Sequence, residues 1–233
     1  MSNIYACREI IQLPNFDARE WLRLCSDHAV TSAFVVPTML TRIIEELQGD
    51  YSLNSLQSIA YGGGKMPVPV IQRALSQFPE VNFTNAYGLT ETSSTITLLG
   101  PEDHREAHSA DDDAAKVRLG SVGKALPSVE IEIRDEEGNT LGADEAGEIY
   151  VRGPQVSGEY EGRSVLDKDG WFPTRDAGYL DDGGYLFLSG RADDVIVRGG
   201  ENISPGEIED LLHEHPAVAD VAVVGIPSEE WGE

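Results

Sequence analysis

Apolar residues in the first hundred positions follow two different spacings. Short runs favour strands at Ala33–Val36, Gln57–Tyr61 and Val81–Ala86. Between them, apolar residues recur every three or four positions, which predicts helices over 39–47 and 67–78, with Pro67 near the start of the second. A further helix is expected over 17–25. The resulting order of strands and helices predicts a parallel sheet covered by helices.

The pattern changes after residue 100. Residues 102–116 are polar and include three consecutive aspartates, so they predict a surface loop or a short exposed helix. Alternating segments then favour strands at 129–134, 148–152 and 185–188, separated by turn residues at 137–139 and 182–184. These short strands predict a small β-subdomain.

The last forty residues differ again. Ser204, Pro205 and Glu207 have the spacing of a helix capping box with proline at the first helical position. Pro216 is expected to end this helix, and the apolar run 218–224 favours a strand. One helix and one strand bury too little surface to form a domain. The expected fold class is therefore α/β plus a β-subdomain, with an α/β portion over about 1–100, a β-subdomain over about 117–190, and a separate segment over 191–233.

Composition narrows the possible partners. The chain has 41 acidic and 17 basic residues, a formal net charge of -24, and such a surface repels nucleic acid. Cys7 and Cys25 form no metal-binding or disulfide pattern, as expected for a reduced compartment. No apolar run is long enough to span a membrane, and the first residues lack the pattern of a signal peptide. The cytoplasm is the expected location, and no nucleic-acid partner or transmembrane segment is expected.

Candidate chemistry follows the strand at 81–86. The segment Asn85–Glu91 reads Asn-Ala-Tyr-Gly-Leu-Thr-Glu. A glycine lets the backbone approach a ligand, and a tyrosine ring offers a flat face to a base. A threonine hydroxyl can donate to a phosphate, and a glutamate offers the hard oxygen ligands that Mg²⁺ prefers. Each feature alone is also compatible with an ordinary turn at a strand end.

This segment resembles the nucleotide-binding motif of the adenylate-forming (AMP-binding) superfamily, which includes acyl-CoA synthetases, luciferases and peptide-synthetase adenylation domains. Three further segments match that superfamily in the same order. They resemble its adenine-side glycine loop, its ribose-binding aspartate motif and its interdomain hinge, at Tyr61–Gly64, Trp171–Asp176 and Gly190–Ile196. Residues 198–203 continue the hinge in a form typical of acyl-CoA synthetases. The resemblance implies a partial AMP-binding domain over 1–190, followed over 191–233 by the hinge and the start of a small α+β C-terminal domain.

The resemblance also implies a role for each matching residue. The adenine would lie between two groups of residues, Gly62, Gly63, Gly64 and Asn85, Ala86, Tyr87, Gly88, with Leu89 beside them and Tyr87 stacking on the base. Asp176 and Arg191 would hold the ribose, and Asp193 would be the hinge about which the small domain rotates. Thr90 and Glu91 would be the catalytic pair, with Thr90 on the α-phosphate and Glu91 on Mg²⁺. Gly199, Gly200 and Glu201 would face the CoA arm.

Several positions depart from the superfamily pattern. Arg175 stands where glycine usually precedes the ribose-binding aspartate, Lys65 where many relatives have proline, and Val197 where some have lysine. The 233 residues also contain neither the Ser/Thr/Gly-rich phosphate loop nor the C-terminal lysine that full-length relatives carry. We therefore expect an internal fragment, a split gene product or a truncated relative, with a possible complementary polypeptide and low activity on its own.

The expected function is that of an ATP-dependent acid–thiol ligase, an acyl-CoA synthetase. It would activate a fatty or otherwise apolar carboxylic acid through an acyl-AMP intermediate, with ATP, Mg²⁺ and CoA. Two alternatives stay open. A peptide-synthetase adenylation domain usually has proline at the position of Leu89 and rarely has the Gly-Gly-Glu-Asn run of residues 199–202. The second alternative is a non-catalytic fragment that binds AMP.

Overall fold

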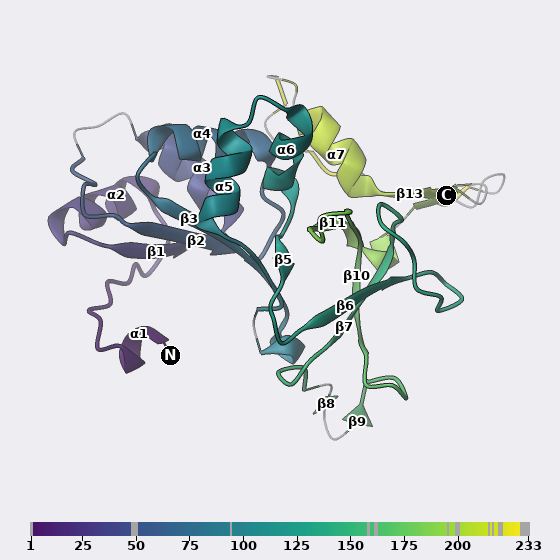
Figure 1. Cartoon of the computed structure of the whole chain (residues 1–233). Helices are drawn as coiled ribbons and strands as arrows, with labels where there is room; N and C mark the ends of the chain where they lie inside the picture. Colours follow the sequence, from purple (N-terminus) through teal and green to yellow (C-terminus); the bar gives the residue numbers. More distant parts are fainter. Residues whose placement is uncertain are drawn as a thin grey trace.

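The computed structural model describes residues 2–47, 51–93, 95–157, 159–160, 163–194, 196–198, 201–213, 215, 217–218 and 221–228. Two sheets dominate these residues, and a single helix follows the second sheet near the C-terminal end (Figure 1). A short helix, α1 (Ser2–Tyr5), begins the chain.

The first sheet has the order β1-β2-β3-β4-β5. Its strands are β1 (Ser32–Val35), β2 (Ser58–Gly62), β3 (Asn82–Tyr87), β4 (Thr97–Leu99) and β5 (Lys124–Ala125). The three strands expected from the sequence pair in parallel, which confirms that part of the prediction. The pairings of β4 with β3 and with β5 are antiparallel, so the sheet is mixed rather than wholly parallel. Strand β5 belongs to this sheet although it falls within the range assigned above to the β-subdomain.

Four helices pack against this sheet. They are α2 (Ala18–Asp27), α3 (Pro37–Glu46), α4 (Val68–Gln77) and α5 (Pro101–Ser109), and Figure 1 shows α3, α4 and α5 along the same side of the strands. The Asp17 side chain caps α2 by accepting a hydrogen bond from the Glu20 amide at 2.9 Å. Proline at the start of α3 and before α4 suits the first turn, where its missing N–H has no helical partner. Leu22, Leu40, Ile43, Ile59, Ile71 and Phe83 are buried where these helices meet the sheet.

The polar segment 102–116 contains a helix, one of the two expected forms, but this helix is only partly exposed. Helix α5 buries one face, on which His104 is 0% and Ala107 2% exposed. The polar sequence misleads because a histidine can be buried when both of its ring nitrogens have hydrogen-bond partners. The shorter helix α6 (Asp113–Val117) follows it.

The second sheet is antiparallel and confirms the predicted β-subdomain strands. Its order is β11-β10-β7-β6, with β6 (Glu130–Arg134), β7 (Gly147–Arg152), β10 (Phe172–Leu180) and β11 (Leu186–Arg191). One face supplies a core of alternating residues, including Ile133, Ile149, Val151, Phe172 and Leu186. A separate pair, β8 (Glu159–Tyr160) and β9 (Arg163–Ser164), lies in the loop between β7 and β10.

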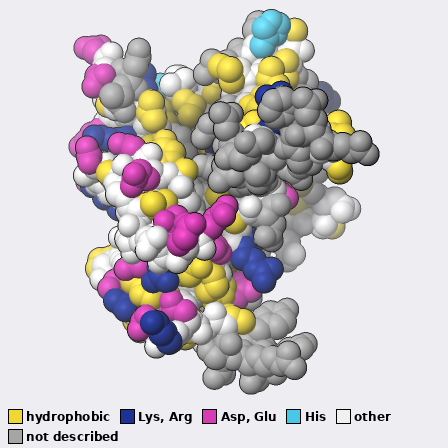
Figure 2. Space-filling view, turned by 90° about the vertical axis from the view of Figure 1, so that its right-hand side faces the viewer, with side chains coloured by type: hydrophobic (Ala, Val, Ile, Leu, Met, Phe, Trp, Pro, Cys, Tyr) yellow, Lys and Arg dark blue, Asp and Glu magenta, His cyan; other side chains and the backbone are white. Residues whose placement is uncertain are grey.

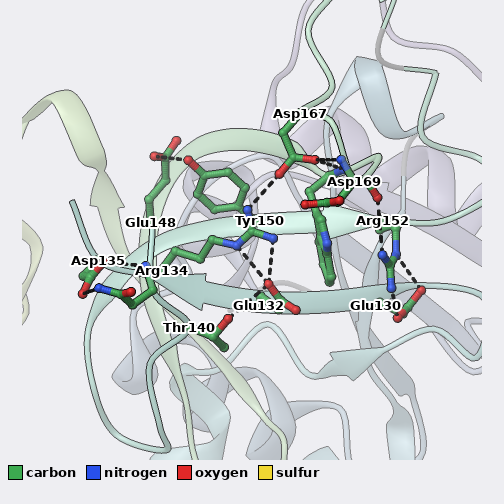
Figure 3. A network of polar contacts seen from close by, with 12 residues as sticks. Glu130, Glu132, Arg134, Asp135, Thr140, Glu148, Tyr150, Arg152, Asp167 and Asp169 are labelled. Atoms are coloured by element: carbon green, nitrogen blue, oxygen red, sulfur yellow. Dashed lines mark hydrogen bonds and ion pairs between the residues drawn. The ribbon is translucent and has the colours of Figure 1, made fainter. Parts of the chain in front are cut away.

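The opposite face of this second sheet carries a network of charged side chains (Figure 3). Arg134 pairs with Glu132 at 2.7 Å and with Asp167 at 2.9 Å, and Arg152 pairs with Glu130 at 2.6 Å. The guanidinium groups of Arg134 and Arg152 lie 5.0 Å and 4.4 Å from the centre of the Trp171 ring. Charge pairing and cation–π contacts therefore cover this face of the sheet, and the network needs no ligand to explain it.

The C-terminal segment packs against the second sheet. A short turn, η3 (Ala192–Asp194), leads to the hairpin of β12 (Ile196–Arg198) and β13 (Glu201–Ile203), and then to helix α7 (Pro205–His213). The predicted helix start at Pro205 is confirmed, whereas the predicted capping box stays a prediction. The Ser204 hydroxyl donates to the Ser189 carbonyl in β11 at 2.8 Å. Pro216, expected to end the helix, lies outside the described residues.

The strand predicted over 218–224 is wrong for the residues of it that the structure describes. Residues 221–224 have no regular secondary structure, and 219–220 lie outside the described residues. The Val223 amide instead donates to the Glu209 carboxylate of α7 at 2.8 Å. In the part of the chain described, no helix is long and apolar enough to cross a membrane.

Candidate functional site

A cleft of about 750 Å³ opens where the two sheets meet. Strands β2 and β3 are parallel, so their carboxyl ends lie at the same edge of the first sheet, and the cleft begins at that edge. Its volume is in the range of sites that hold a nucleotide-sized ligand. Ten of the predicted site residues line it: Gly62, Gly63, Gly64, Asn85, Ala86, Tyr87, Gly88, Leu89, Asp176 and Arg191.

The three glycines at the end of β2 do different work. A β-carbon on Gly62 would lie 2.5 Å from the Ala86 carbonyl oxygen, so this glycine permits the close approach of β2 to β3. Gly63 has φ of +78°, a backbone conformation that other residues rarely adopt. A β-carbon on Gly64 would meet nothing closer than 3.9 Å. Gly62 and Gly63 therefore shape the loop, while Gly64 leaves open space in the cleft wall.

A buried pair of polar side chains, Tyr61 and His104, lies at the end of β2 next to the glycine loop. The hydroxyl of Tyr61, which precedes Gly62 in β2, lies 2.8 Å from Nε2 of His104. Nδ1 of His104 lies 2.7 Å from the Gly100 carbonyl oxygen, which can only accept, so Nδ1 carries the ring proton. Tyr61 consequently donates to Nε2. Burial lowers the pKa of His104 below its ordinary value and raises that of Tyr61, so both side chains stay neutral near pH 7.

Tyr87 and Asp176 meet across the two sheets. The Tyr87 hydroxyl donates to one Asp176 carboxylate oxygen at 2.6 Å, although the residues are 89 positions apart. Arg191, which is opposite Asp176 in the β10–β11 pairing, contacts the other carboxylate oxygen at 2.9 Å. Burial, and then the Asp176 charge, raise the pKa of Tyr87, so its hydroxyl keeps its proton at neutral pH. The expectation that Asp176 and Tyr87 line one cleft with the glycine loop agrees with this geometry.

The departure at Arg175 has a backbone explanation. Arg175 has φ of +60° and is exposed, beside a register shift between β10 and β7. The left-handed conformation favours glycine, the residue expected there from the family resemblance. The arginine side chain is on the solvent side, so it leaves the neighbouring Asp176 carboxylate in the cleft.

Thr90 and Glu91 follow directly after the cleft wall. They form the short turn η1 (Thr90–Thr92), and neither is among the residues that line the cleft. The buried Thr92 hydroxyl bonds to the Leu89 backbone and holds this turn. Thr90 is exposed and Glu91 is half-buried, so both side chains remain open to a ligand that extends past Leu89. Their catalytic roles stay predictions.

Asn85 contributes to the site through its backbone and packing. It is buried, and its amide nitrogen donates to the Ser121 carbonyl at 3.3 Å. This bond fixes the segment before β5 against β3. The side-chain amide of Asn85 is therefore already engaged within the protein.

The third wall of the cleft was not predicted from the sequence. Lys65 comes from the loop after β2. The other residues come from the second sheet and the C-terminal segment, and are Leu188, Ser189, Gly190, Asp194, Ile196, Pro205, Gly206, Glu209, Val223, Val224 and Gly225. A β-carbon on Gly206 would lie 2.8 Å from the Ser189 carbonyl oxygen and 3.5 Å from the Lys65 ammonium. From the sequence, Lys65 was noted only as a departure from the family pattern, and no binding role was predicted for it. The signal in the sequence was Gly206, a glycine at the second position of the predicted helix, which permits α7 to pack closely against β11.

The predicted hinge and CoA-side residues are only partly described. The backbone of Asp193 lies in the turn η3 between β11 and β12. Glu201 begins β13 and pairs with Arg198 in register, whereas Gly199 and Gly200 lie outside the described residues. The hinge and CoA-side roles of these residues therefore stay predictions.

The net charge of -24 works against an anionic ligand, and the cleft itself carries charges of both signs. Figure 2 shows acidic side chains in several separate groups on one face, with fewer basic side chains among them. Lys65 and Arg191 bring positive charge to the cleft, where Asp176, Asp194 and Glu209 also lie. Local cations and backbone donors, rather than the overall field, have to attract a nucleotide.

Comparison with known proteins identifies two family matches. Residues 7–161 match the family described as AMP-binding enzyme, and residues 207–233 match the AMP-binding enzyme C-terminal domain. The chain is 38% identical over 237 aligned residues to the 2-succinylbenzoate–CoA ligase of Bacillus cereus (strain Q1), covering 100% of this chain and 46% of the relative. It is 35% identical to the medium/long-chain-fatty-acid–CoA ligase FadD8 of Mycobacterium tuberculosis, covering 97% of this chain and 38% of that one.

A solved structure shows the same arrangement of elements. The o-succinylbenzoate CoA synthetase of Bacillus subtilis, in complex with its acyl-adenylate intermediate, superposes with a TM-score of 0.81. It is 34% identical, and the match covers 99% of this chain and 45% of that one. The same synthetase has been solved with ATP and magnesium ion. The chain thus spans about half the length of the relatives it matches.

Proposed function

The chain belongs to the AMP-binding enzyme family, and we propose that it supplies the nucleotide-binding part of an ATP-dependent acid–thiol ligase. This ligase would form an acyl-CoA through an acyl-AMP intermediate. The observation that carries the proposal is the meeting of Tyr87, Asp176 and Arg191 in one cleft beside the glycine loop. A carboxylate with two hydrogen-bond donors fixing it suits the two hydroxyl groups of a ribose.

The remaining cleft residues complete a nucleotide site. The open space at Gly64 and the backbone of Ala86 would admit the flat adenine, and the half-buried Tyr87 ring would pack against it. The base would enter the cleft and the phosphates would extend past Leu89 toward Thr90. The Thr90 hydroxyl would donate to an oxygen of the α-phosphate. The substrate carboxylate would attack the phosphorus of that group and displace pyrophosphate. In this order the reacting phosphorus would lie at the edge of the cleft, where an acid would reach it.

Glu91 is the proposed magnesium ligand. Mg²⁺ is usually held by one or two carboxylates together with substrate phosphates, rather than by a cage of protein ligands. Glu91 offers a half-buried carboxylate next to Thr90, and no cluster of three or more metal-binding side chains occurs in the described residues. When bound, the ion would neutralise charge on the phosphates of ATP. Glu91 would hold it in place, and Thr90 would orient the α-phosphate.

The acid is proposed to have an apolar body attached to its reacting carboxylate. The named relatives act on 2-succinylbenzoate and on medium- or long-chain fatty acids, and both kinds of acid combine apolar surface with a carboxylate. CoA is the proposed acceptor, approaching along residues 199–201. Rotation at Asp193 would present a different face of the C-terminal segment to the cleft for the thiol step.

A second candidate is an AMP-binding unit that becomes catalytic only with a complementary polypeptide. The chain spans about half the length of the relatives named above, so turnover is tested with and without the remaining part. The peptide-synthetase alternative is less well supported, because Leu89 stands where proline is usual and the relatives named above are CoA ligases.

Calorimetric titration of the 233-residue chain with AMP tests the proposal. We expect saturable binding that weakens in Asp176→Asn and persists in Asp169→Asn, a matched change in an exposed turn outside the cleft. No AMP binding by the folded wild-type chain, or equal loss in both variants, would refute the nucleotide site. CoA-thioester formation from 2-succinylbenzoate, benzoate and octanoate is then measured with and without a polypeptide that supplies the part of the relatives not spanned. Turnover only in the mixture supports the second candidate.

A further inference from the structure

The Tyr87 hydroxyl makes a hydrogen bond that base stacking by the Tyr87 ring does not require. Stacking against a base needs only the aromatic face, which a phenylalanine also provides. In this structure the hydroxyl donates to Asp176 at 2.6 Å, from the end of β3 to the middle of β10. The bond therefore joins the predicted adenine side of the cleft to the predicted ribose side.

The two donors on Asp176 are divided between its two oxygens. Tyr87 donates to Oδ2, and Arg191 contacts Oδ1 at 2.9 Å. Each carboxylate oxygen can accept about two hydrogen bonds in favourable directions. With one direction on each oxygen already used, one further acceptor direction remains on each. The two oxygens of Asp176 can therefore each accept one hydrogen bond from a ribose, whose two hydroxyl groups lie on adjacent carbons.

The orientation of the carboxylate depends on both donors. Rotation about the terminal bond of an aspartate side chain is soft, so packing alone does not fix the carboxylate plane. Arg191 is 55% exposed, and an exposed ion pair constrains geometry weakly. Both contacts are charge-assisted, but Tyr87 is half-buried and its hydroxyl lies 2.6 Å from Oδ2, so solvent screens this contact less than the Arg191 contact.

We propose that the Tyr87 hydroxyl is a positioning group that makes the cleft selective for a ribose over a deoxyribose. It holds the Asp176 carboxylate so that both sugar hydroxyls are bound at once. The inference rests on the proposed nucleotide site and deepens it, because it assigns sugar selectivity to a residue whose expected role was base stacking. Tyr87 does not contact the reacting atoms, so it acts through Asp176.

The test compares AMP with 2′-deoxy-AMP and 3′-deoxy-AMP, first on the wild-type chain. We expect each deoxynucleotide to bind about 10-fold or more weakly than AMP, because each leaves one charged acceptor without its donor. Equal binding of all three nucleotides by the wild-type chain overturns the inference without any mutation. Failure to bind any of the three overturns the proposed nucleotide site itself, which is a separate result.

The Tyr87→Phe variant then isolates the hydroxyl, since it keeps the ring. We expect AMP to bind about 3- to 10-fold more weakly and the preference for AMP over 2′-deoxy-AMP to shrink to about 3-fold or less. Tyr185→Phe is the matched control, because the Tyr185 hydroxyl donates to Asp103 at 2.7 Å outside the cleft. The control should keep the full preference. An unchanged preference in Tyr87→Phe shows that the hydroxyl only ties the sheets together and refutes the inference.

Discussion

Acidification should weaken the fold through His104. The imidazole is 0% exposed, donates from Nδ1 to the Gly100 carbonyl and accepts at Nε2 from the Tyr61 hydroxyl. A proton added to Nε2 would face the Tyr61 proton and would place a charge within the core. Burial consequently lowers the pKa of His104 from its ordinary value of 6.5.

The sign of the pH effect follows from proton uptake in the two states. Below about pH 6.5 the unfolded chain protonates His104 while the folded chain resists it, so the unfolded state binds more protons. The stability contribution is fully present above the unfolded pKa and is lost as the pH falls. Its greatest slope is about 1.4 kcal/mol per pH unit. The free energy of unfolding therefore falls between pH 7 and pH 5, by at most about 2 kcal/mol.

Urea denaturation at pH 7, 6 and 5 and constant ionic strength measures this loss. His104→Phe should flatten the pH dependence, and at pH 7 it should cost about 1–3 kcal/mol because Tyr61 loses its acceptor. The double variant with Tyr61→Phe should recover part of that cost. His108→Gln, on the same helix but only half-buried, should keep the wild-type slope. A slope in His104→Phe equal to that of the wild type, or a wild-type chain that gains stability toward pH 5, would refute the argument.

Four further outcomes are expected. Asp176→Ala should weaken AMP binding by about 1.5–3 kcal/mol, roughly 10- to 150-fold, in calorimetry, and equal affinity would remove this residue from the site. Arg175→Gly should raise the free energy of unfolding by about 0.5–1 kcal/mol by relieving a left-handed backbone, whereas a loss would contradict that reading. Gly62→Ala should cost about 1–3 kcal/mol in denaturation while Gly64→Ala costs little, because only the first lacks room for a β-carbon. A polypeptide of these 233 residues should release pyrophosphate from ATP no faster than its Glu91→Ala variant, and clear excess release would show that it needs no partner.

The sequence determined the local order of elements and the identity of the family. Short apolar runs located β1 to β3, helical spacing located the helices between them, and alternating positions located most strands of the second sheet. These patterns reflect which face of each element is buried. The order of four motifs identified the nucleotide-binding family, which comparison with known proteins supports. The glycines at 62–64 were predicted from the sequence to form a loop, but the different structural role of each glycine was not predicted.

Tertiary contacts decided the rest. The antiparallel edge of β4 and β5, the burial of His104 and the irregular backbone at 221–224 depend on partners distant in sequence. A polar residue is buried or exposed according to whether its hydrogen bonds are met, and local spacing carries no record of that. The same holds for the cleft. Tyr87 and Asp176 were each found from their motifs, but only the packing of the two sheets placed one hydroxyl 2.6 Å from one carboxylate, because that distance depends on how the two sheets pack against each other.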